Sequence, residues 1–356
     1  MQPKSKYSKK LIYVGSLNKT PDRDSMWIRE LSNLGWKVLT FSSRVNISGN
    51  YILKKIKKRF SFGAEYRAMR FKLIELCEYE KPDWIHFRLP IEFDVFTLKK
   101  IKKIVPLMTE YFNDDPFSNK SPFGLNWRFR SLIHLYDINF TYRKKNLIDF
   151  KKMGAKEVYH LPPMYDPLTK FKVDNKNNDS NGYMADAAFI GHWENDQRVE
   201  FLSKVITCGY SLLLHGSNWE KGIKNTPLKK LLPVKSLFGN DYNRIYSNVI
   251  AGICFFSKIN HDTFTERALE IIATGGVLVC ERTDEAMSHF TDGVDALFFE
   301  TPEELVNHIK LLKKRPDIRK KIQISGYSKL INGQFTIFDR VKFLDNLVNK
   351  KFVEHR

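Results

Sequence analysis

Short apolar runs alternate with helical hydrophobic periods along nearly the whole chain. Apolar runs at 11–14 and 36–41 flank a stretch, 23–34, whose large apolar residues recur at a spacing near 3.6. Strand–helix alternation of this kind is typical of a parallel sheet with helices on both faces. The pattern therefore predicts an α/β fold of the doubly wound, Rossmann-like type.

The alternation breaks once, at the polar, Asn-rich stretch 170–184, and then restarts. Because 356 residues exceed one ordinary core, we expect two such domains, 1–169 and 185–335, with 170–184 as linker. A last amphipathic helix within 336–356 is expected to return to the first domain. Ligands of doubly wound sheets bind outside the carboxyl ends of the strands, so the predicted site is a central cleft that both domains face. Further strands are predicted at 84–87, 105–112, 137–141, 157–161, 187–191, 211–215, 250–256 and 277–280, and helices at 64–80, 94–103, 125–135, 144–153, 196–208, 240–247, 263–273, 302–314, 316–330 and 337–350.

Composition narrows the class of protein. Apolar residues make up 42% of the chain, which excludes a wholly disordered protein. No window approaches eighteen consecutive apolar residues, so the sequence predicts no membrane-spanning helix. We see no export signal, and the four cysteines are widely spaced with no metal-site spacing, as expected for reduced thiols in a cytoplasmic protein. The net charge of +19 favours polyanionic partners, namely nucleic acid, anionic lipid or phosphorylated substrates.

Several common site motifs are missing from the sequence. No GxGxxG follows the first strand, and GxxxxGK[ST], HExxH, GxSxG and paired CxxC motifs do not occur. Simple dehydrogenase, P-loop, metalloprotease, hydrolase and zinc-module interpretations therefore lose their usual support.

The most informative stretch runs from Asp262 to Cys280, where a loop, a helix, a Gly-Gly turn and a strand follow one another. Arg267 and Glu270 are three residues apart and share one helix face. A carboxylate there can bind the vicinal hydroxyls of a ribose, and the arginine can bind phosphate oxygens. The alternative is a surface ion pair, with Asp262 as the cap of the helix.

A second candidate lies in the loop after the strand at 187–191. Gly191 allows a ligand close to the backbone, and Arg198 lies in a first helical turn, where a cation needs an anionic partner such as phosphate. His192 belongs to the same loop. The alternative is an ordinary loop in which Asp196 caps the helix.

The first domain offers polar residues at two strand ends. Gly15 and Ser16 follow the first strand, and Asp114 and Asp115 follow the strand at 105–112. Adjacent carboxylates at a strand tip can act as a general base or bind hydroxyls, although Asp-Asp-Pro is also a common turn. His86 ends a neighbouring strand and is more simply interpreted as a core histidine.

Residues 51–60 form a basic amphipathic segment. Its apolar residues fall on one helical face, a pattern typical of a helix lying on an anionic membrane surface. The alternative is a helix whose apolar stripe packs against the protein. The basic residues are Lys54, Lys55, Lys57, Lys58 and Arg59.

With these residues in view, the sequence resembles GT-B glycosyltransferases, specifically the group related to spore maturation protein CgeB within the group 1 type. The resemblance spans nearly the whole chain in consistent order. It rests on EYFNDDP, DINFTYRKKNLIDFKKMGAKEVYHLPPMYDP, FIGHWENDQR, RALEIIATGGVLVCE and HFTDGVDALFFETPEEL.

The resemblance implies a nucleotide-sugar donor in the second domain and an acceptor in the first. Glu270 matches the acid that binds the donor ribose, Arg267 the arginine three residues before it, and Asp262 the first acid of a pair eight positions apart. It also implies that no metal and no cofactor take part, since the nucleotide-sugar is a substrate. The remaining matches are Gly191 and Arg198 near the diphosphate, Lys204 as an accompanying lysine, and Asp114 or Asp115 as base if the reaction inverts configuration.

We therefore expect a metal-independent glycosyltransferase that acts on a lipid-linked or glycan acceptor in bacterial cell-surface polysaccharide synthesis. We expect it in the cytoplasm, peripheral at the inner face of the membrane, with no nucleic-acid partner. The alternatives are a GT-B-shaped sugar-nucleotide epimerase and a non-catalytic binder of polyanions or nucleic acid.

Overall fold

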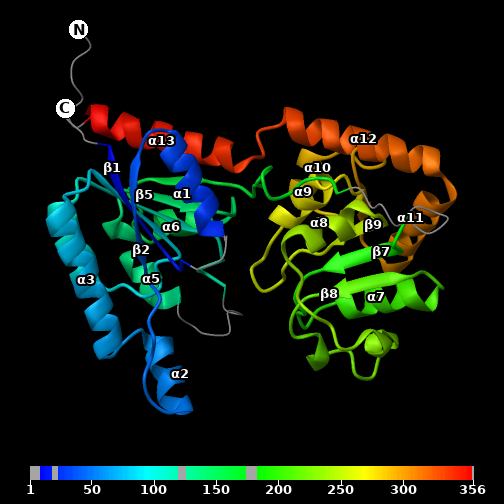
Figure 1. The fold of residues 1–356 in the computed structure, drawn as a ribbon, viewed down its shortest axis with the longest axis horizontal. Coiled ribbons are helices and arrows are strands. Elements are labelled where there is room, and N and C mark those ends of the chain that lie inside the picture. The colour runs from blue at the N-terminus through cyan, green and yellow to red at the C-terminus, as the bar shows by residue number, and fades with distance from the viewer. Residues whose placement is uncertain (1–8, 18–22, 119–125, 174–182, 355–356) are drawn as a thin grey trace, which may run out of the picture. The chain divides into compact units, whose positions relative to one another are not determined.

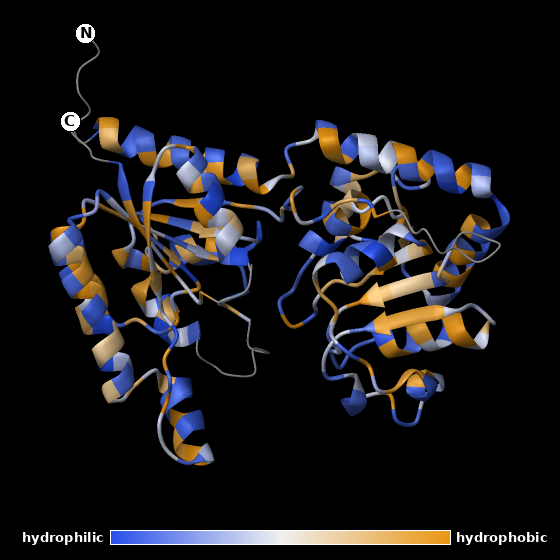
Figure 2. Cartoon of the chain, viewed as in Figure 1, coloured by the Kyte–Doolittle hydropathy of each residue, from blue (hydrophilic) through white to orange (hydrophobic). Residues whose placement is uncertain are grey.

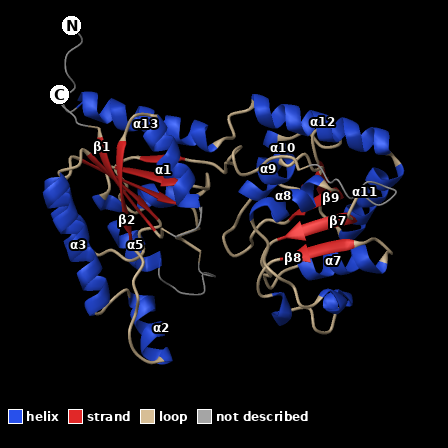
Figure 3. Ribbon diagram, viewed as in Figure 1, coloured by secondary structure: helices blue, strands red, loops and turns tan. Residues whose placement is uncertain are grey.

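The computed structural model divides into two compact units, each built around one parallel sheet (Figures 1 and 3). The first unit comprises Met1–Pro162 and Ile337–Arg356, and the second comprises Pro163–Thr336. No helix among the described residues has the length and apolar character needed to cross a bilayer. The structure describes residues 9–17, 23–118, 126–173 and 183–354.

The first unit contains a six-stranded sheet with the order β2-β1-β3-β4-β5-β6, and all of its pairings are parallel. Its strands are β1 (Lys10–Gly15), β2 (Lys37–Ser42), β3 (Trp84–Arg88), β4 (Leu107–Phe112), β5 (Ile138–Thr141) and β6 (Val158–His160). Its helices are α1 (Arg23–Asn33), α2 (Tyr51–Phe60), α3 (Ala64–Glu80), α4 (Val95–Ile104), α5 (Asn126–Leu132), the 3-10 turn η1 (Ile133–Leu135), α6 (Asn146–Lys152) and α13 (Ile337–Glu354).

The second unit contains a five-stranded parallel sheet with the order β11-β10-β9-β7-β8. Its strands are β7 (Ala185–Ile190), β8 (Leu212–His215), β9 (Val249–Cys254), β10 (Leu278–Glu281) and β11 (Leu297–Phe299). Its helices are α7 (Arg198–Thr207), the 3-10 turns η2 (Trp219–Lys221) and η3 (Pro227–Leu231), α8 (Gly239–Ser247), α9 (Glu266–Ala273), α10 (Asp284–His289), α11 (Pro302–Lys314) and α12 (Pro316–Asn332).

Strand β7 shows why the apolar runs of this sequence become buried strands. Successive side chains of a strand point to opposite faces of a sheet. Ala188 and Ile190 belong to one apolar core of the second unit, and Ala187 and Phe189 belong to the other. Both faces of the sheet are therefore covered by helices, and a continuous apolar run supplies buried side chains to both. Figure 2 shows β7 and β8 in the colours of hydrophobic residues.

The predicted fold class, two doubly wound α/β domains, is confirmed. The sequence pattern did not reveal β11 or α10, which are only three and six residues long. In place of one helix over 125–135, the structure has the shorter helix α5 followed by the 3-10 turn η1.

The chain passes between the units earlier than the sequence indicated. Residues 163–169, expected in the first domain, belong to the second unit. Tyr165 explains this difference, because its backbone N–H donates to Phe335 O at 3.0 Å and ties the segment to the end of that unit. Of the predicted linker 170–184, residues 174–182 lie outside the described residues.

The last helix, α13, packs on the first unit beside α1 (Figure 1). Its buried face carries Val341, Leu344 and Val348. The Trp36 indole N–H donates to Asp345 Oδ1 at 2.7 Å, and both groups are buried. This bond fixes the position of the helix more specifically than apolar packing does.

We expect Asp345→Ala to lower the free energy of unfolding by about 1–3 kcal/mol, because the buried indole N–H loses its acceptor. Urea denaturation followed by circular dichroism measures the change. Asn346→Ala is the matched control, since Asn346 is the exposed neighbour on the same helix. Equal stability of the two variants would contradict the assigned role of this hydrogen bond.

Candidate functional site

Gly191 and Arg267 meet at the carboxyl edge of the second sheet. Gly191 follows β7, and a Cβ atom there would lie 3.0 Å from Arg267 Nη2. Arg267 reaches this point from the first turn of α9, where its guanidinium lies 5.3 Å from the Phe189 ring centre. The structure therefore brings together two residues that the sequence singled out in separate motifs.

The loop after β8 lies against the same residue, Gly191. A Cβ atom on Gly216, just after β8, would lie 1.9 Å from Gly191 O, and the φ of Gly216 is +138°. A side chain is excluded here by contact and by conformation. The same carbonyl also accepts a hydrogen bond from Trp219 Nε1 at 2.8 Å. Nothing in the sequence pattern identified Gly216, because its neighbour in space lies twenty-five residues earlier in the chain.

Glu270 occupies the same face of α9, one turn after Arg267. Tyr242 OH donates to Glu270 Oε2 at 2.7 Å, and Lys170 Nζ lies 3.5 Å from Oε1. The Glu270 side chain remains 20% exposed. Burial, and then the charge of Glu270, raise the pKa of Tyr242 well above its usual value, so the phenol stays protonated and donates. Glu270 is thus a fixed carboxylate with a solvent-accessible edge.

Sequence reasoning missed both partners of Glu270. Lys170 was counted in the predicted linker, yet it lies 3.9 Å above the Tyr242 ring. Tyr242 belongs to α8, whose short amphipathic pattern gave no sign of a site. The proximity of these side chains to Glu270 depends on the tertiary fold.

Arg198 is placed differently from the prediction. Its side chain is buried, with Nε and Nη2 each donating to an Asp196 carboxylate oxygen at 2.8 Å, and Nη1 donating to His192 O at 2.7 Å. The anion that a cation in a first helical turn requires is thus the neighbouring Asp196. Arg198 shapes the loop from inside, which does not favour its predicted contact with a diphosphate.

Glu194 connects the parts of this loop. It accepts hydrogen bonds from His192 Nε2 at 2.9 Å and from Lys258 N at 3.2 Å, and Arg198 Nη2 lies 3.4 Å away. Burial alone would raise the pKa of Glu194, but the His192 hydrogen bond and the Arg198 charge lower it to about 2. Glu194 is buried whereas His192 is about half exposed. The buried Glu194 carboxylate therefore fixes the orientation of the His192 ring, and the rest of the ring is accessible to solvent.

Glu281, at the end of β10, holds the neighbouring strand ends together. Its Oε2 accepts from Phe256 N at 2.6 Å and its Oε1 from Gln197 Nε2 at 2.9 Å. Lys258 Nζ lies 3.1 Å from Oε1 with its side chain 44% exposed. Lys258 is thus an accessible cation at this edge that the sequence did not single out.

One predicted donor residue, Lys204, lies apart from these contacts. Lys204 pairs with Glu303 of α11 at 2.8 Å, and both side chains are exposed. Its offset of six residues from Arg198 places it about 9 Å farther along α7, which does not favour its predicted place beside the diphosphate. Asp262 lies in the loop before α9, but the N-cap of α9 is Thr265, so Asp262 does not cap the helix.

In the first unit, Gly15 lies against a buried carboxylate. A Cβ atom on Gly15 would be 3.0 Å from the Asp24 carboxylate. Asp24 accepts hydrogen bonds from Tyr13 OH at 2.9 Å and from Arg88 at 2.5 Å. Ser16 is exposed, and its hydroxyl accepts from Arg44 Nε at 2.9 Å. The sequence identified Gly15 and Ser16 but not the ion pair beside them.

The two carboxylates after β4 differ sharply. Asp115 is buried, with Oδ1 accepting from Asn146 Nδ2 at 3.0 Å and Oδ2 lying 2.8 Å from Lys145 Nζ. This engagement favours a structural role for Asp115. Asp114 is exposed and is therefore the better placed candidate base. His86 is fully buried, and burial lowers its pKa to about 3, in agreement with a core histidine.

Helix α2 (Figure 1) forms as predicted. None of its residues is buried. Ile52 is 68% exposed, and Ile56 and Phe60 are more than 40% exposed, so the apolar stripe does not pack against the protein. The Lys57 ammonium lies 2.8 Å from Glu65 Oε1. Lys54, Lys55, Lys58 and Arg59 are exposed.

The four described ranges contain no group of three or more His, Cys, Asp or Glu residues placed to hold a metal ion.

The depressed pKa of Glu194 predicts a pH-dependent contribution to stability. The contribution is complete above about pH 4.5, where the unfolded carboxyl is ionised, and is lost as pH falls toward about 2. We therefore expect Glu194→Gln to be less stable than wild type at pH 7, with a difference that narrows below pH 4.5. Urea unfolding across that pH range measures it, and a constant difference would contradict the assigned ionisation.

Residues 197–346 match the model of a family described as glycosyl transferase-like. No curated protein sequence matches the chain. Among solved structures, sucrose-phosphate synthase from Thermosynechococcus elongatus is 10% identical with a TM-score of 0.68, over 97% of this chain and 100% of that one. A glycosyltransferase from Rickettsia africae is 14% identical with a TM-score of 0.63, over 98% and 99% of the two chains.

HepE from Anabaena, solved in complex with UDP and glucose, is 11% identical with a TM-score of 0.66, over 96% of this chain and 99% of that one. At sequence identities this low, the structural similarity shows a shared fold and nothing finer. The chain therefore has the GT-B fold, and its residues 197–346 are similar to the glycosyl transferase-like family. The finer CgeB-like assignment stays a prediction.

Proposed function

We propose that the chain is a glycosyltransferase whose second unit binds a nucleotide-sugar donor. The observation that carries this proposal is the shared face of α9. There Glu270 presents a carboxylate held by Tyr242, and Arg267 presents a guanidinium beside Gly191, one helical turn away. The glycosyl transferase-like match covers this helix, and the structure of HepE with UDP and glucose supports the choice of ligand.

Each group has a distinct task in this proposal. The open edge of the Glu270 carboxylate accepts hydrogen bonds from the ribose hydroxyls of the donor. Arg267, the exposed ammonium of Lys258 and the open edge of His192 supply positive charge and donors for the diphosphate. The departing nucleoside diphosphate gains negative charge as the glycosidic bond breaks, so fixed donors at this edge lower the barrier.

The finer part of the proposal concerns the acceptor. We propose a lipid-linked or glycan acceptor of bacterial cell-surface polysaccharide synthesis, used by a cytoplasmic enzyme at the inner face of the membrane. Helix α2 supports this, because its exposed apolar and basic side chains match an anionic membrane surface. If the reaction inverts configuration, Asp114 is the proposed base. We propose a mechanism that uses the residues of the chain without a metal or cofactor.

A panel of nucleotide-sugars with product analysis tests the reaction class. Transfer to an added lipid-linked or glycan acceptor supports the proposal. Isomerisation of the donor without transfer would overturn it in favour of an epimerase.

Glu270→Ala is expected to weaken UDP binding roughly tenfold or more, because hydrogen bonds from ribose hydroxyls to a charged group are lost. Isothermal titration calorimetry with UDP measures this. Glu303→Ala is the control, since Glu303 is an exposed glutamate of the same unit whose carboxylate lies 2.8 Å from Lys204 Nζ at the far end of α7. Unchanged affinity in Glu270→Ala would refute the assignment of the ribose site.

Replacing Lys54, Lys55, Lys58 and Arg59 of α2 by Ser is expected to weaken binding to vesicles that contain phosphatidylglycerol by at least about tenfold. Each basic residue near an anionic surface contributes roughly 1 kcal/mol. Co-sedimentation with phosphatidylcholine vesicles, with and without phosphatidylglycerol, measures the effect. Undiminished binding would remove α2 from the proposed membrane contact. The control replaces four exposed lysines of the second unit, Lys224, Lys229, Lys230 and Lys320, by Ser.

A further inference from the structure

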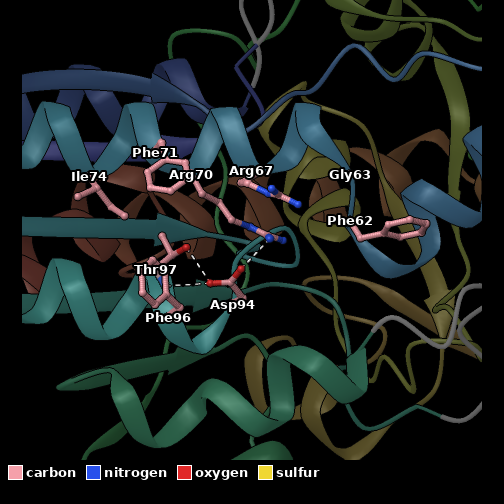
Figure 4. Close-up of a pocket in the computed structure, with 9 residues that line it drawn as sticks. All are labelled: Phe62, Gly63, Arg67, Arg70, Phe71, Ile74, Asp94, Phe96 and Thr97. Carbon is pink, nitrogen blue, oxygen red and sulfur yellow. Dashed lines mark hydrogen bonds and ion pairs between the residues drawn. The ribbon is translucent and has the colours of Figure 1, made fainter.

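A cavity of about 310 Å³ opens between α3 and α4 of the first unit (Figure 4). Its rim carries three aromatic side chains, Phe62, Phe71 and Phe96, which are 45%, 45% and 58% exposed. Single exposed apolar residues are common on proteins, but several around one hollow mark a place where apolar matter binds. The volume is near the lower limit for small-ligand pockets, so it fits part of a ligand.

The charged side chains of the inner wall, Arg70 and Asp94, are already paired. Arg70 Nη1 donates to Asp94 Oδ2 at 2.6 Å, Nη2 donates to Ser61 O at 2.6 Å, and Nε donates to Glu92 O at 2.8 Å. Asp94 also caps α4, since it accepts from Thr97 N at 2.8 Å (Figure 4). Neither Arg70 nor Asp94 therefore needs a ligand to satisfy it.

Arg67 is different. It lies three residues before Arg70 on α3, it lines the same cavity, and it is exposed (Figure 4). Within the described ranges, no side chain or carbonyl forms a hydrogen bond or ion pair with its guanidinium. The cavity thus has one unpaired planar cation beside apolar walls, which suits a group that is anionic at one end and hydrocarbon at the other.

The position of the cavity connects it with α2. Phe62 and Gly63, which line it, join α2 directly to α3. The segment carrying α2 leaves the carboxyl end of β2, and Asp94 follows the carboxyl end of β3, the strand that also pairs with β1. The cavity therefore opens near the sheet edge where ligands of such folds bind, next to the exposed apolar residues of α2.

We propose that this cavity binds the phosphate and the first methylene groups of one anionic lipid, with the phosphate on Arg67 and the hydrocarbon between Phe62, Phe71 and Phe96. That this lipid is also the acceptor of the transfer rests on the proposed function. A free inorganic phosphate would leave the aromatic rim unused, and a neutral lipid would leave Arg67 unpaired.

Soluble short-chain lipids test the proposal on the full chain. Calorimetry is expected to show tighter binding of dihexanoyl phosphatidic acid than of dihexanoylglycerol, which lacks the phosphate, or of inorganic phosphate. Arg67→Ala should reduce affinity for the phosphatidic acid roughly tenfold, toward that of the dihexanoylglycerol. Phe71→Ser should weaken both lipids but leave phosphate unchanged. Lys72→Ala, which removes an exposed cation from the same helix outside the cavity, should change nothing.

Two results would overturn the proposal. One is equal phosphatidic acid affinity in wild type, Arg67→Ala and Phe71→Ser. The other is phosphate binding as tight as that of the lipid, which would indicate a simple anion site. The α2 variant with four serines should still bind the soluble lipid, which separates the cavity from vesicle docking. UDP affinity, measured in parallel, checks folding, and loss of UDP binding alone would fault the proposed function and not this cavity.

Discussion

The second unit depends on the close approach of three backbone segments at the carboxyl edge of its sheet. Gly191 and Gly216 bring the loops after β7 and β8 into direct contact, and Arg267 of α9 fills the space that a side chain on Gly191 would take. Main-chain atoms and a guanidinium thereby share one surface. Such a surface is suited to an anionic ligand, because the absence of a side chain at Gly191 leaves room beside the Arg267 guanidinium.

The polar residues of this edge fall into two groups with different roles. Glu194, Arg198 and Glu281 are buried and satisfy one another or nearby backbone groups, so they maintain the shape of the loops. Glu270 and Lys258 keep exposed surface and remain able to meet a ligand. Burial requires pairing of charges, and residues whose hydrogen bonds are all used inside the protein have little left for a substrate.

In the first unit, exposed apolar side chains lie beside basic side chains. Helix α2 leaves its apolar stripe uncovered and surrounds it with basic residues, and the cavity beside it combines an aromatic rim with unpaired Arg67. The +19 net charge of the chain is thus partly concentrated where apolar groups are also exposed. A phosphate-bearing lipid satisfies both properties, whereas a nucleic acid would satisfy only the charge.

The alternation of apolar runs and helical periods determined the fold class, and the i, i+3 spacing of Arg267 and Glu270 determined that they share a face, because both are local consequences of backbone geometry. Tertiary structure alone decided which charges stay available. Arg198 and Lys204 were plausible by position, but Asp196 and Glu303 engage them. Lys170, Tyr242 and Lys258 join the site from distant segments, since proximity between residues far apart in sequence arises only when the strands and helices pack.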